Sequence, residues 1–516
     1  MLQPSFSFET RDRDLAEMSR AEVELLVIGG GITGAGIARD AAMRGLRVAL
    51  VERGDLASGT SSRSSKLIHG GLRYLEQGEV GLVLEAAAER RTLRRIATHL
   101  AVPGRMALPV HGRTGAGLMK LRAGLWAYEK MARIVQDERH EIWKRDETLD
   151  HVHGLEPENL QGAAVYTEYV TDDARLTLET VKSAKRAGAL IATYAPAVGI
   201  VEESPATSTG GGAAARSPRL RVTIADELSG RRHEVTARVV VNASGPWVDA
   251  VRGLGNAAAP RMHLTKGIHL VVSRERLPVD DMIVMRAVDR RMVFVVPFGD
   301  IVWIGTTDTD YPQAVERPTI TREDVDYLLE ATNRTWPQAR IGDDDVRGAW
   351  AGVRPLLHQE GKKPSEISRR DEILVEPNGL ISIGGGKLTT YRRMAERVVD
   401  AAVERLGTSA ARPCTTADVP LVEGETPIPI VRTALSDADV LYAIESECAV
   451  SICDVLERRA RSNLFASGNG LPDVERVGGI LAERLGWDDR RLATEIETYR
   501  ARIAEDVAWR APRSRE

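Results

Sequence analysis

The clearest hydrophobic pattern lies near the N-terminus, where two short apolar runs flank a helical one. Leu25 to Ile28 is an unbroken apolar run that ends at three consecutive glycines, as a buried parallel strand does. From Ile32 to Gly45, small and apolar residues recur at helical spacing, and residues 46–51 form a second apolar run. The pattern predicts a strand–helix–strand unit, which is typical of parallel α/β proteins.

The glycines of the first turn predict a nucleotide site. Gly29, Gly31 and Gly34 have G-x-G-x-x-G spacing, which permits a tight turn, close approach to a pyrophosphate and close helix–strand packing. Glu52 ends the second strand, where a carboxylate can accept hydrogen bonds from an adenosine ribose and would repel a 2′-phosphate. Glycines alone also mark ordinary turns. Here strand, glycines, helix, second strand and acid occur in register, so we expect a dinucleotide site.

The same strand-then-small-residue pattern recurs twice further along the chain. Residues 238–241, which are apolar after Arg238, lead into Ala243 and Gly245, and residues 380–383 lead into Gly385 and Gly386 before a helix over 391–406. Between them, residues 292–310 predict a hairpin. After about residue 410 the pattern predicts helices over 437–445, 451–460, 471–485 and 489–507.

Two polar stretches lack such a pattern. Residues 1–20 are predicted to be a mobile N-terminal lead, and the low-complexity residues 202–219 an exposed hairpin loop or an insertion. The predicted domains are therefore the lead over 1–20, an oxidoreductase-sized α/β region over 21–405 and a helical C-terminal domain over 406–516.

Composition narrows the class of protein. A chain of 516 residues is too long for one core, and 43% hydrophobic with 28% charged residues is ordinary for a globular protein. A net charge of −4 gives no reason to expect nucleic-acid binding. Three cysteines without a C-x-x-C pair argue for a reducing compartment and against a disulfide framework or a zinc site, and no metal site is visible in the sequence. No apolar run approaches membrane-spanning length and no signal-peptide core is visible, so we expect a cytoplasmic protein.

Residues 53–76 contain the highest density of side chains that could bind a ligand or transfer a proton. Hydroxyls and glycines alone would favour a flexible loop. However, Lys66, His69, Arg73 and Tyr74 are spaced so that they could converge on one side of a short helix. Such side chains are suited to holding an anion and moving a proton.

Seven motifs in order carry a resemblance to a known family. They are SSKLIHGGLRYLE at 64–76, YVTDDARLTLET at 169–180, VVVNASGPWVD at 239–249, TKGIHLVV at 265–272, GTTDTDY at 305–311, AGVRPL at 351–356 and GGGKLTTYR at 384–392. Together they resemble the FAD-dependent glycerol-3-phosphate dehydrogenases of the D-amino-acid-oxidase-like flavoprotein superfamily. The resemblance covers roughly residues 23 to 400, and the tail is similar to the family's helical C-terminal domain more loosely. The family usually has threonine where Ser244 stands, a departure that keeps the hydroxyl.

This resemblance implies the fold and the cofactor. The fold class would be α/β, with a Rossmann-like FAD-binding domain interleaved with an antiparallel-sheet substrate domain and an all-α C-terminal domain. FAD would bind at the glycines and Glu52 named above and at a further set comprising Arg53, Thr60, Ser61, Ser65, Lys66, Ala243, Gly245, Gly385, Gly386, Lys387, Leu388 and Thr389.

The resemblance also implies roles in the oxidation of sn-glycerol 3-phosphate to dihydroxyacetone phosphate. Arg354, Arg73 and Tyr74 would hold the substrate phosphate, with Lys387 there or beside the flavin. His69 is the preferred base because its ordinary pKa lies near working pH, and Lys266 would stabilise charge on the reacting oxygen. His269 is interpreted as an ordinary core histidine. Thr306, Thr307 and Asp308 could line the pocket or cap a turn, and the sequence does not separate these.

The electron acceptor and partners stay open. Residues 113–134 predict a basic amphipathic helix that packs on the core or lies in a membrane interface, where the family delivers electrons to quinone. An oxidase that produces peroxide shares the motifs, and a flavin-binding scaffold without redox activity belongs to a different class. An amino-acid oxidase is less consistent with so many cations. We expect peripheral contact with the inner face of the plasma membrane at most, and a homodimer is also open.

Overall fold

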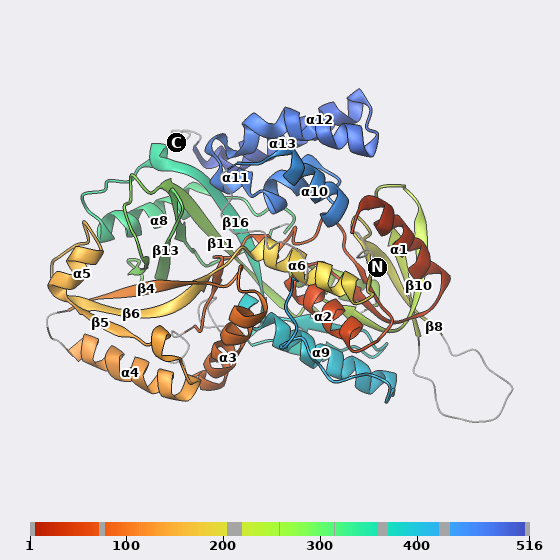
Figure 1. The fold of residues 1–516 in the computed structure, drawn as a ribbon, viewed down its shortest axis with the longest axis horizontal. Coiled ribbons are helices and arrows are strands. Elements are labelled where there is room, and N and C mark those ends of the chain that lie inside the picture. The colour runs from red at the N-terminus through yellow and green to blue at the C-terminus, as the bar shows by residue number, and fades with distance from the viewer. Residues whose placement is uncertain are drawn as a thin grey trace.

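Two sheets, each assembled from several stretches of the chain, form the α/β part of the protein (Figure 1). The computed structural model describes residues 6–71, 78–112, 114, 116–203, 219–256, 259–313, 315–359, 370–422 and 434–510. The first sheet takes strands from residues 23–51, 190–242 and 372–384, and the second from 67–68, 102–170 and 262–357. This alternation confirms the predicted interleaving of two domains.

The first sheet has eight strands. The main path runs β17-β18-β10-β1-β2-β7, and the hairpin β8–β9 continues from β10. β18, β10, β1, β2 and β7 are parallel to their neighbours on this path, while β17 and β9 pair antiparallel. The bounds are β1 Val23–Ile28, β2 Val48–Val51, β7 Leu190–Ala192, β8 Ala197–Glu203, β9 Arg219–Ala225, β10 Arg232–Asn242, β17 Glu372–Val375 and β18 Ile381–Gly384.

Both faces of this sheet are covered, which explains the unbroken apolar run of β1. Leu25 and Val27 pack on one side with the helices α2, α6 and α9, whereas Leu26 and Ile28 pack on the other. The helices are α2 Ile32–Met43, α6 Asp173–Arg186 and α9 Tyr391–Leu406. The short helix α7, Val248–Leu254, follows β10.

The prediction of a mobile lead over residues 1–20 is wrong for its described part. Residues Phe8–Arg20 form helix α1, whose first turn is capped by the Ser7 hydroxyl. Leu15 and Met18 are buried against the outer face of the first sheet. Arg11 is fully buried and donates to Thr193 O at 2.9 Å. Apolar residues at helical spacing therefore form a packed layer here, despite the surrounding charges.

The second sheet has ten strands and is mostly antiparallel. Its path is β15-β11-β14-β13-β12-β4-β6-β3, with β16 paired to β11 and β5 to β6. The bounds are β3 Leu67–Ile68, β4 Val102–His111, β5 Glu141–Lys144, β6 Leu160–Val170, β11 Met262–Ser273, β12 Met282–Arg286, β13 Met292–Phe298, β14 Ile301–Gly305, β15 Thr309–Asp310 and β16 Val346–Leu357. The predicted hairpin over 292–310 is the pair β13–β14.

Helices also pack against this second sheet. α8, Arg322–Thr335, packs Val325 and Leu328 on a core with Ile268 and Leu270 of β11. The others are α3 Val80–Ile96, α4 Ala116–Ala132 and α5 Arg145–His151.

The C-terminal helices form a separate layer that lies along one side of both sheets (Figure 1). Val440, Ile452, Val477 and Ile503 belong to a core of its own. The helices are α10 Asp437–Glu447, α11 Ser462–Phe465, α12 Val474–Leu485 and α13 Asp489–Asp506, and the stretch Asp454–Arg459 is a π-helical turn labelled η8. The helical C-terminal domain is confirmed, although the helix predicted over residues 451–460 is π-helical over Asp454–Arg459.

Candidate active site

The carboxyl ends of four parallel strands meet at one edge of the first sheet. Ile28 of β1 lies opposite both Asn242 of β10 and Val51 of β2, and Asn242 lies opposite Ser382 of β18. The turns that follow these strands are therefore neighbours. They contain the glycine motif, Glu52, the Ala243–Gly245 turn and the Gly385–Gly386 turn, so parallel pairing gathers residues that are hundreds of positions apart.

The glycine turn has the conformation and the close contacts expected of a nucleotide site. Gly29 has φ +118°, and a Cβ there would stand 2.6 Å from Ala243 O. A Cβ at Gly34 would overlap Gly29 O, so helix α2 packs directly on the turn. α2 begins at Ile32, and its N-cap residue Gly31 has no side chain that could accept an N–H of the first turn. The N–H groups of this helix start fit the pyrophosphate of a dinucleotide.

Glu52 holds the same turn from the neighbouring strand. Its carboxylate accepts the N–H of Gly30 at 2.5 Å and of Gly54 at 2.9 Å. Burial raises the pKa of this carboxyl, and the two N–H donors oppose the shift. Glu52 therefore braces the glycine turn. Its contact with an adenosine ribose stays a prediction.

Residues 53–65, here called the cofactor loop, fold back onto the glycine turn. The Ser61 hydroxyl accepts the N–H of Ile32 at 2.9 Å, and Ala57 N–H donates to Gly30 O at 3.1 Å. Thr60 donates to Val353 O of β16 at 2.6 Å, which joins the loop to the second sheet. Arg53 lies over the Trp247 ring. The loop thus lies between the two sheets.

The structure does not present the Lys66 ammonium to a ligand. Lys66 Nζ is buried and donates to Asp173 Oδ1 at 2.9 Å and to Ser62 O at 3.0 Å. Burial, together with nearby Arg461, lowers the pKa of Lys66 to about 8 against the pull of Asp173. The predicted short helix is also wrong for its described part, because residues 67–68 form strand β3. Arg73 and Tyr74 lie outside the described residues.

The turn after β18 connects to the candidate base. Gly385 and Gly386 have φ +73° and +88°, and Lys387 precedes the short 3-10 helix Leu388–Thr390. The Thr389 hydroxyl accepts His69 N–H at 3.1 Å and lies 3.2 Å from His69 O. The Gly385–Gly386 turn and the His69–Gly71 stretch after β3 are thus joined by hydrogen bonds, which places His69 beside a turn that is predicted to bind FAD.

His69 lines a cavity of about 1220 Å³ between the second sheet and α4. Its ring lies 6.2 Å from that of Phe294 on β13, measured between centroids. The buried Glu168 of β6 also lines the cavity and accepts the N–H of the next residue, Gly70, at 3.0 Å. Arg90 donates to Glu168 at 2.9 Å. Burial raises the pKa of Glu168, and Arg90 opposes that shift. The histidine therefore sits on a backbone held from two sides.

One face of the second sheet carries the remaining candidate groups. Phe294, Gly305, His269 and Trp350 lie opposite one another in a row across β13, β14, β11 and β16. The His269 ring stacks on Trp350 with centroids 4.5 Å apart, and its Nε2 lies 2.9 Å from Ser65 Oγ. Burial, with Arg354 and Lys66 nearby, lowers the pKa of His269 well below its ordinary value. His269 is therefore neutral near pH 7 and touches the cofactor loop.

Arg354 lies across this same face. Its Nη1 is 3.1 Å from Asp308 Oδ1, and its Nη2 donates to Thr306 Oγ1 at 2.8 Å. A Cβ at Gly267 would overlap the guanidinium, so the glycine makes room for it. The Arg354 side chain keeps 20% exposure. Thr306 and Asp308 both orient Arg354, and whether they also line the substrate pocket stays a prediction.

Lys266 is not where its predicted role requires. Residues alternate along β11, so Lys266 lies on the opposite face from Gly267 and His269, next to α8. Its Nζ donates to Asp324 Oδ2 at 2.5 Å and to Thr319 O at 2.9 Å. We therefore interpret Lys266 as half of a structural ion pair. The interpretation of His269 as an ordinary core residue missed its place against Ser65.

The sequence reasoning also missed Glu168 and Asp308 as partners of candidate residues. The available signal was weak: a single carboxylate in an otherwise apolar strand for Glu168, and a turn acid for Asp308. Among the described residues, no group of three or more His, Cys, Asp and Glu could hold a metal ion. Cys414, Cys448 and Cys453 are free thiols.

A parallel nucleotide-binding sheet interleaved with an antiparallel sheet defines a flavoprotein oxidoreductase, and the glycine turn fits FAD. The family model for FAD-dependent oxidoreductases matches residues 24–392, and the model for the C-terminal domain of alpha-glycerophosphate oxidase matches residues 387–492. The chain is 41% identical to an aerobic glycerol-3-phosphate dehydrogenase of Bacillus subtilis over 82% of this chain and 75% of that one. A Staphylococcus aureus enzyme of the same name is 42% identical over 75% and 68% of the two chains.

Comparison with solved structures indicates the same family. The glycerol-3-phosphate dehydrogenase of Bacillus halodurans, complexed with FAD, is 30% identical and covers 98% of this chain and 99% of that one, with a TM-score of 0.78. The L-alpha-glycerophosphate oxidase of Mycoplasma pneumoniae shares the fold at 17% identity, with a TM-score of 0.58 over 78% of this chain and 100% of that one. The chain belongs to the FAD-dependent oxidoreductases, in the family of the FAD-dependent glycerol-3-phosphate dehydrogenases. Its cofactor is FAD.

Proposed function

We propose that this enzyme oxidises the secondary hydroxyl of sn-glycerol 3-phosphate to the ketone of dihydroxyacetone phosphate, and that the electrons pass to a membrane quinone. The relatives at 41–42% identity that bear this activity in their names support the substrate. The structural observation that carries it is Arg354, a guanidinium held in one orientation by Asp308 and Thr306 yet partly exposed. A fixed planar fork is suited to a phosphate dianion.

Substrate binding and proton removal are carried out by different residues. Arg354 binds the phosphate, and Arg73, Tyr74 and Lys387 are the further candidates for that contact. Binding energy at the phosphate, remote from the reacting carbon, orients that carbon. His69 removes the hydroxyl proton, since an imidazole has a pKa near working pH. FAD, when bound, accepts the hydrogen of the carbon together with two electrons.

The cavity at His69 supports a route by which the quinone, as electron acceptor, approaches the active site from α4. From His69 and Gly71 it extends beneath α4, where Leu121, Gly124 and Leu125 line it. α4 packs Leu125 and Tyr128 inward and leaves Trp126 58% and Met119 74% exposed beside exposed Arg122 and Lys130. Apolar side chains next to cations are typical of helices that lie in a membrane interface. We propose that α4 contacts the inner face of the plasma membrane and that the enzyme is otherwise cytoplasmic.

Within the described residues, no helix is both long enough and apolar enough to cross a bilayer. Membrane contact is tested by sedimentation with anionic vesicles. Replacing Trp126 with Ser should weaken vesicle binding by about tenfold, since it removes most of an apolar side chain that would be buried in the membrane interface. The control, Val201→Ser, changes an exposed apolar residue of β8 and should bind as before. Equal binding of all three proteins would contradict a role for α4.

The main experiment follows the flavin absorbance of the holoenzyme under anaerobic conditions. We expect glycerol 3-phosphate to bleach it, a quinone analogue to restore it rapidly and oxygen to restore it slowly. Replacing His69 with Ala should slow the bleaching by about 100-fold or more, the usual contribution of a general base. Near-normal bleaching in that variant would remove His69 as the base.

The oxidase is the alternative that a specific observation favours. The C-terminal part of the chain matches the model named for alpha-glycerophosphate oxidase. Rapid restoration of the flavin by oxygen, with stoichiometric peroxide, would replace the quinone proposal by this one. A flavin that stays oxidised with glycerol 3-phosphate would instead revive a scaffold without redox activity. The oligomeric state, including a homodimer, does not enter this test.

A further inference from the structure

The C-terminal domain places three arginines of one short segment against the cofactor loop. Arg458 and Arg459 end the π-helical turn η8, and Arg461 follows after Ala460. All three are at most 4% exposed. The cofactor loop, which includes the predicted FAD-binding residues Thr60 and Ser61, thus has the predicted FAD site on one side and the C-terminal domain on the other.

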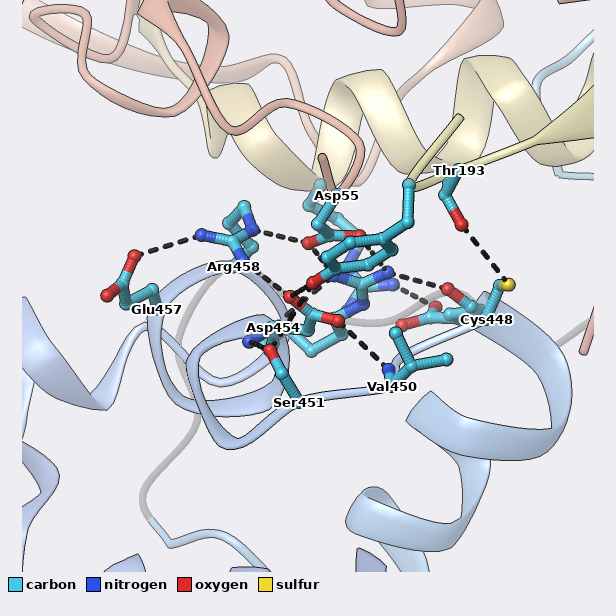
Figure 2. A network of polar contacts seen from close by, with 12 residues as sticks. Asp55, Thr193, Cys448, Val450, Ser451, Asp454, Glu457 and Arg458 are labelled. Carbon is cyan, nitrogen blue, oxygen red and sulfur yellow. Dashed lines mark hydrogen bonds and ion pairs between the residues drawn. The ribbon is translucent and has the colours of Figure 1, made fainter. Parts of the chain in front are cut away.

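The first contact is made with Asp55, which is 2% exposed. Arg459 Nη2 donates to Asp55 Oδ1 at 2.9 Å, and both Arg459 Nη1 and Arg458 Nε donate to Oδ2. Figure 2 shows Asp55 reaching from the loop to Arg458, which Asp454 and Glu457 also contact. Two guanidinium groups therefore hold one buried carboxylate of the loop, and a low-dielectric interior makes such pairs sensitive to geometry.

The second contact fixes the far end of the loop. Arg461 Nη2 donates to Asp173 Oδ1 at 3.0 Å and lies 3.3 Å from Ser62 O. Asp173 Oδ2 in turn accepts the Ser64 N–H at 2.9 Å and the Ser64 hydroxyl at 2.7 Å. Arg461 thus supports the loop at Ser62 directly and at Ser64 through Asp173.

The opposite side of the loop faces the glycine turn. Between the two anchored ends, Ala57 N–H donates to Gly30 O, and the Ser61 hydroxyl accepts Ile32 N–H at the start of α2. A Cβ at Gly30 would stand 2.8 Å from the Leu56 side chain, so the fit on this side is also tight. A shift of Asp55 would therefore move the residues that shape the pyrophosphate end of the FAD site.

We propose that Arg458 and Arg459 are positioning residues for FAD: through Asp55 they hold the cofactor loop in its FAD-binding shape, so that the C-terminal domain is part of the cofactor site. The proposal depends on the FAD cofactor of the family and is independent of the substrate and the electron acceptor. It gives the C-terminal helices a role in retaining the flavin.

The test compares three variants of the holoenzyme. Arg459→Met removes the charge at similar length, Arg459→Lys restores a charge without the fork, and Glu447→Gln is the control. Glu447 is 1% exposed and pairs with Arg175 across the same interface. Within the described part of the chain, its carboxylate contacts Arg175 and Lys182 of α6 and not the cofactor loop. Two quantities are measured without glycerol 3-phosphate: the rate of FAD release on dilution, from flavin fluorescence, and the temperatures of FAD release and of backbone unfolding.

We expect Arg459→Met to release FAD at least about tenfold faster, the factor for loss of one charge-assisted hydrogen bond, and Arg459→Lys to recover most of the difference. In Arg459→Met, FAD should also leave well below the temperature of backbone unfolding. Glu447→Gln should lower both temperatures together and leave the release rate at 25 °C unchanged. FAD release at the wild-type rate from Arg459→Met, or equally fast release from Glu447→Gln, would overturn the proposal.

If Arg459→Met does not fold, Asp55→Asn makes the same measurement from the loop side, and wild-type FAD release in that variant would equally overturn the proposal. Failure of the proposed dehydrogenase reaction would leave these results unaffected, because they concern only bound flavin.

Discussion

The carboxylate of Glu168 accepts the backbone N–H of Gly70, the residue that follows His69. Glu168 is 2% exposed and pairs with Arg90 of α3. A strand of the second sheet and a helix thus fix the backbone of the candidate base, which Thr389 holds from the cofactor side.

Replacing Glu168 with Gln should slow anaerobic flavin reduction at saturating substrate by about tenfold, equivalent to about 1.4 kcal/mol of activation free energy. The amide supplies a weaker acceptor for Gly70 and leaves Arg90 poorly paired. Stopped-flow absorbance measures the rate. The matched control is Glu138→Gln, which removes the other carboxylate on Arg90 without touching Gly70. If both variants reduce the flavin at the same rate, Glu168 does not position His69.

Replacing Arg354 with Lys should raise the KM for glycerol 3-phosphate by about tenfold or more, since the bidentate fork is lost while the charge stays. Asp308→Asn should raise KM less, because it loosens the guanidinium without removing it. Steady-state kinetics with a dye acceptor measure both. An unchanged KM in Arg354→Lys would show that the phosphate is bound elsewhere.

Replacing Lys266 with Met should destabilise the protein without slowing flavin reduction more than about twofold. The variant leaves Asp324 buried without its cation, and breaking such a buried pair costs about 3–5 kcal/mol. Chemical denaturation and stopped-flow reduction separate the two effects. A large loss of reduction rate in a stable Lys266→Met protein would restore the catalytic role predicted from the sequence.

His269 should make the free energy of unfolding depend on pH below neutrality. Burial lowers its pKa well below 6.5 in the folded protein, whereas the unfolded chain binds a proton near pH 6.5. The unfolded state therefore binds more protons below that pH. The stabilisation is complete above about pH 6.5 and falls with decreasing pH, by at most about 1.4 kcal/mol per pH unit.

Denaturant unfolding at pH 5 to 7.5 of the wild type and of His269→Gln isolates this slope. The comparison is needed because Asp506, whose pKa burial raises to about 6, contributes the opposite slope in both proteins. Parallel stability curves for the two proteins would mean that His269 has the same pKa in the folded and the unfolded state, and would contradict this prediction.

The sequence by itself determined the local units and what they bind. The strand–glycine–helix–strand unit, the helix Tyr391–Leu406 and the hairpin β13–β14 depend on neighbours within a few turns of chain, so residue spacing predicts them. The seven motifs likewise identified a family whose cofactor is FAD.

Only the tertiary structure decided which side chains meet. Strand alternation places Lys266 and His269 on opposite faces, and the sequence does not say which face turns towards the cofactor loop. Glu168 reaches Gly70 and Arg459 reaches Asp55 across 98 and 404 residues, respectively. Such contacts arise when separate elements pack and bury charge together, and no local pattern encodes the partner. Packing also explains why residues 8–20 form helix α1 although the sequence predicted a mobile lead. Leu15 and Met18 become buried only because the first sheet lies against them.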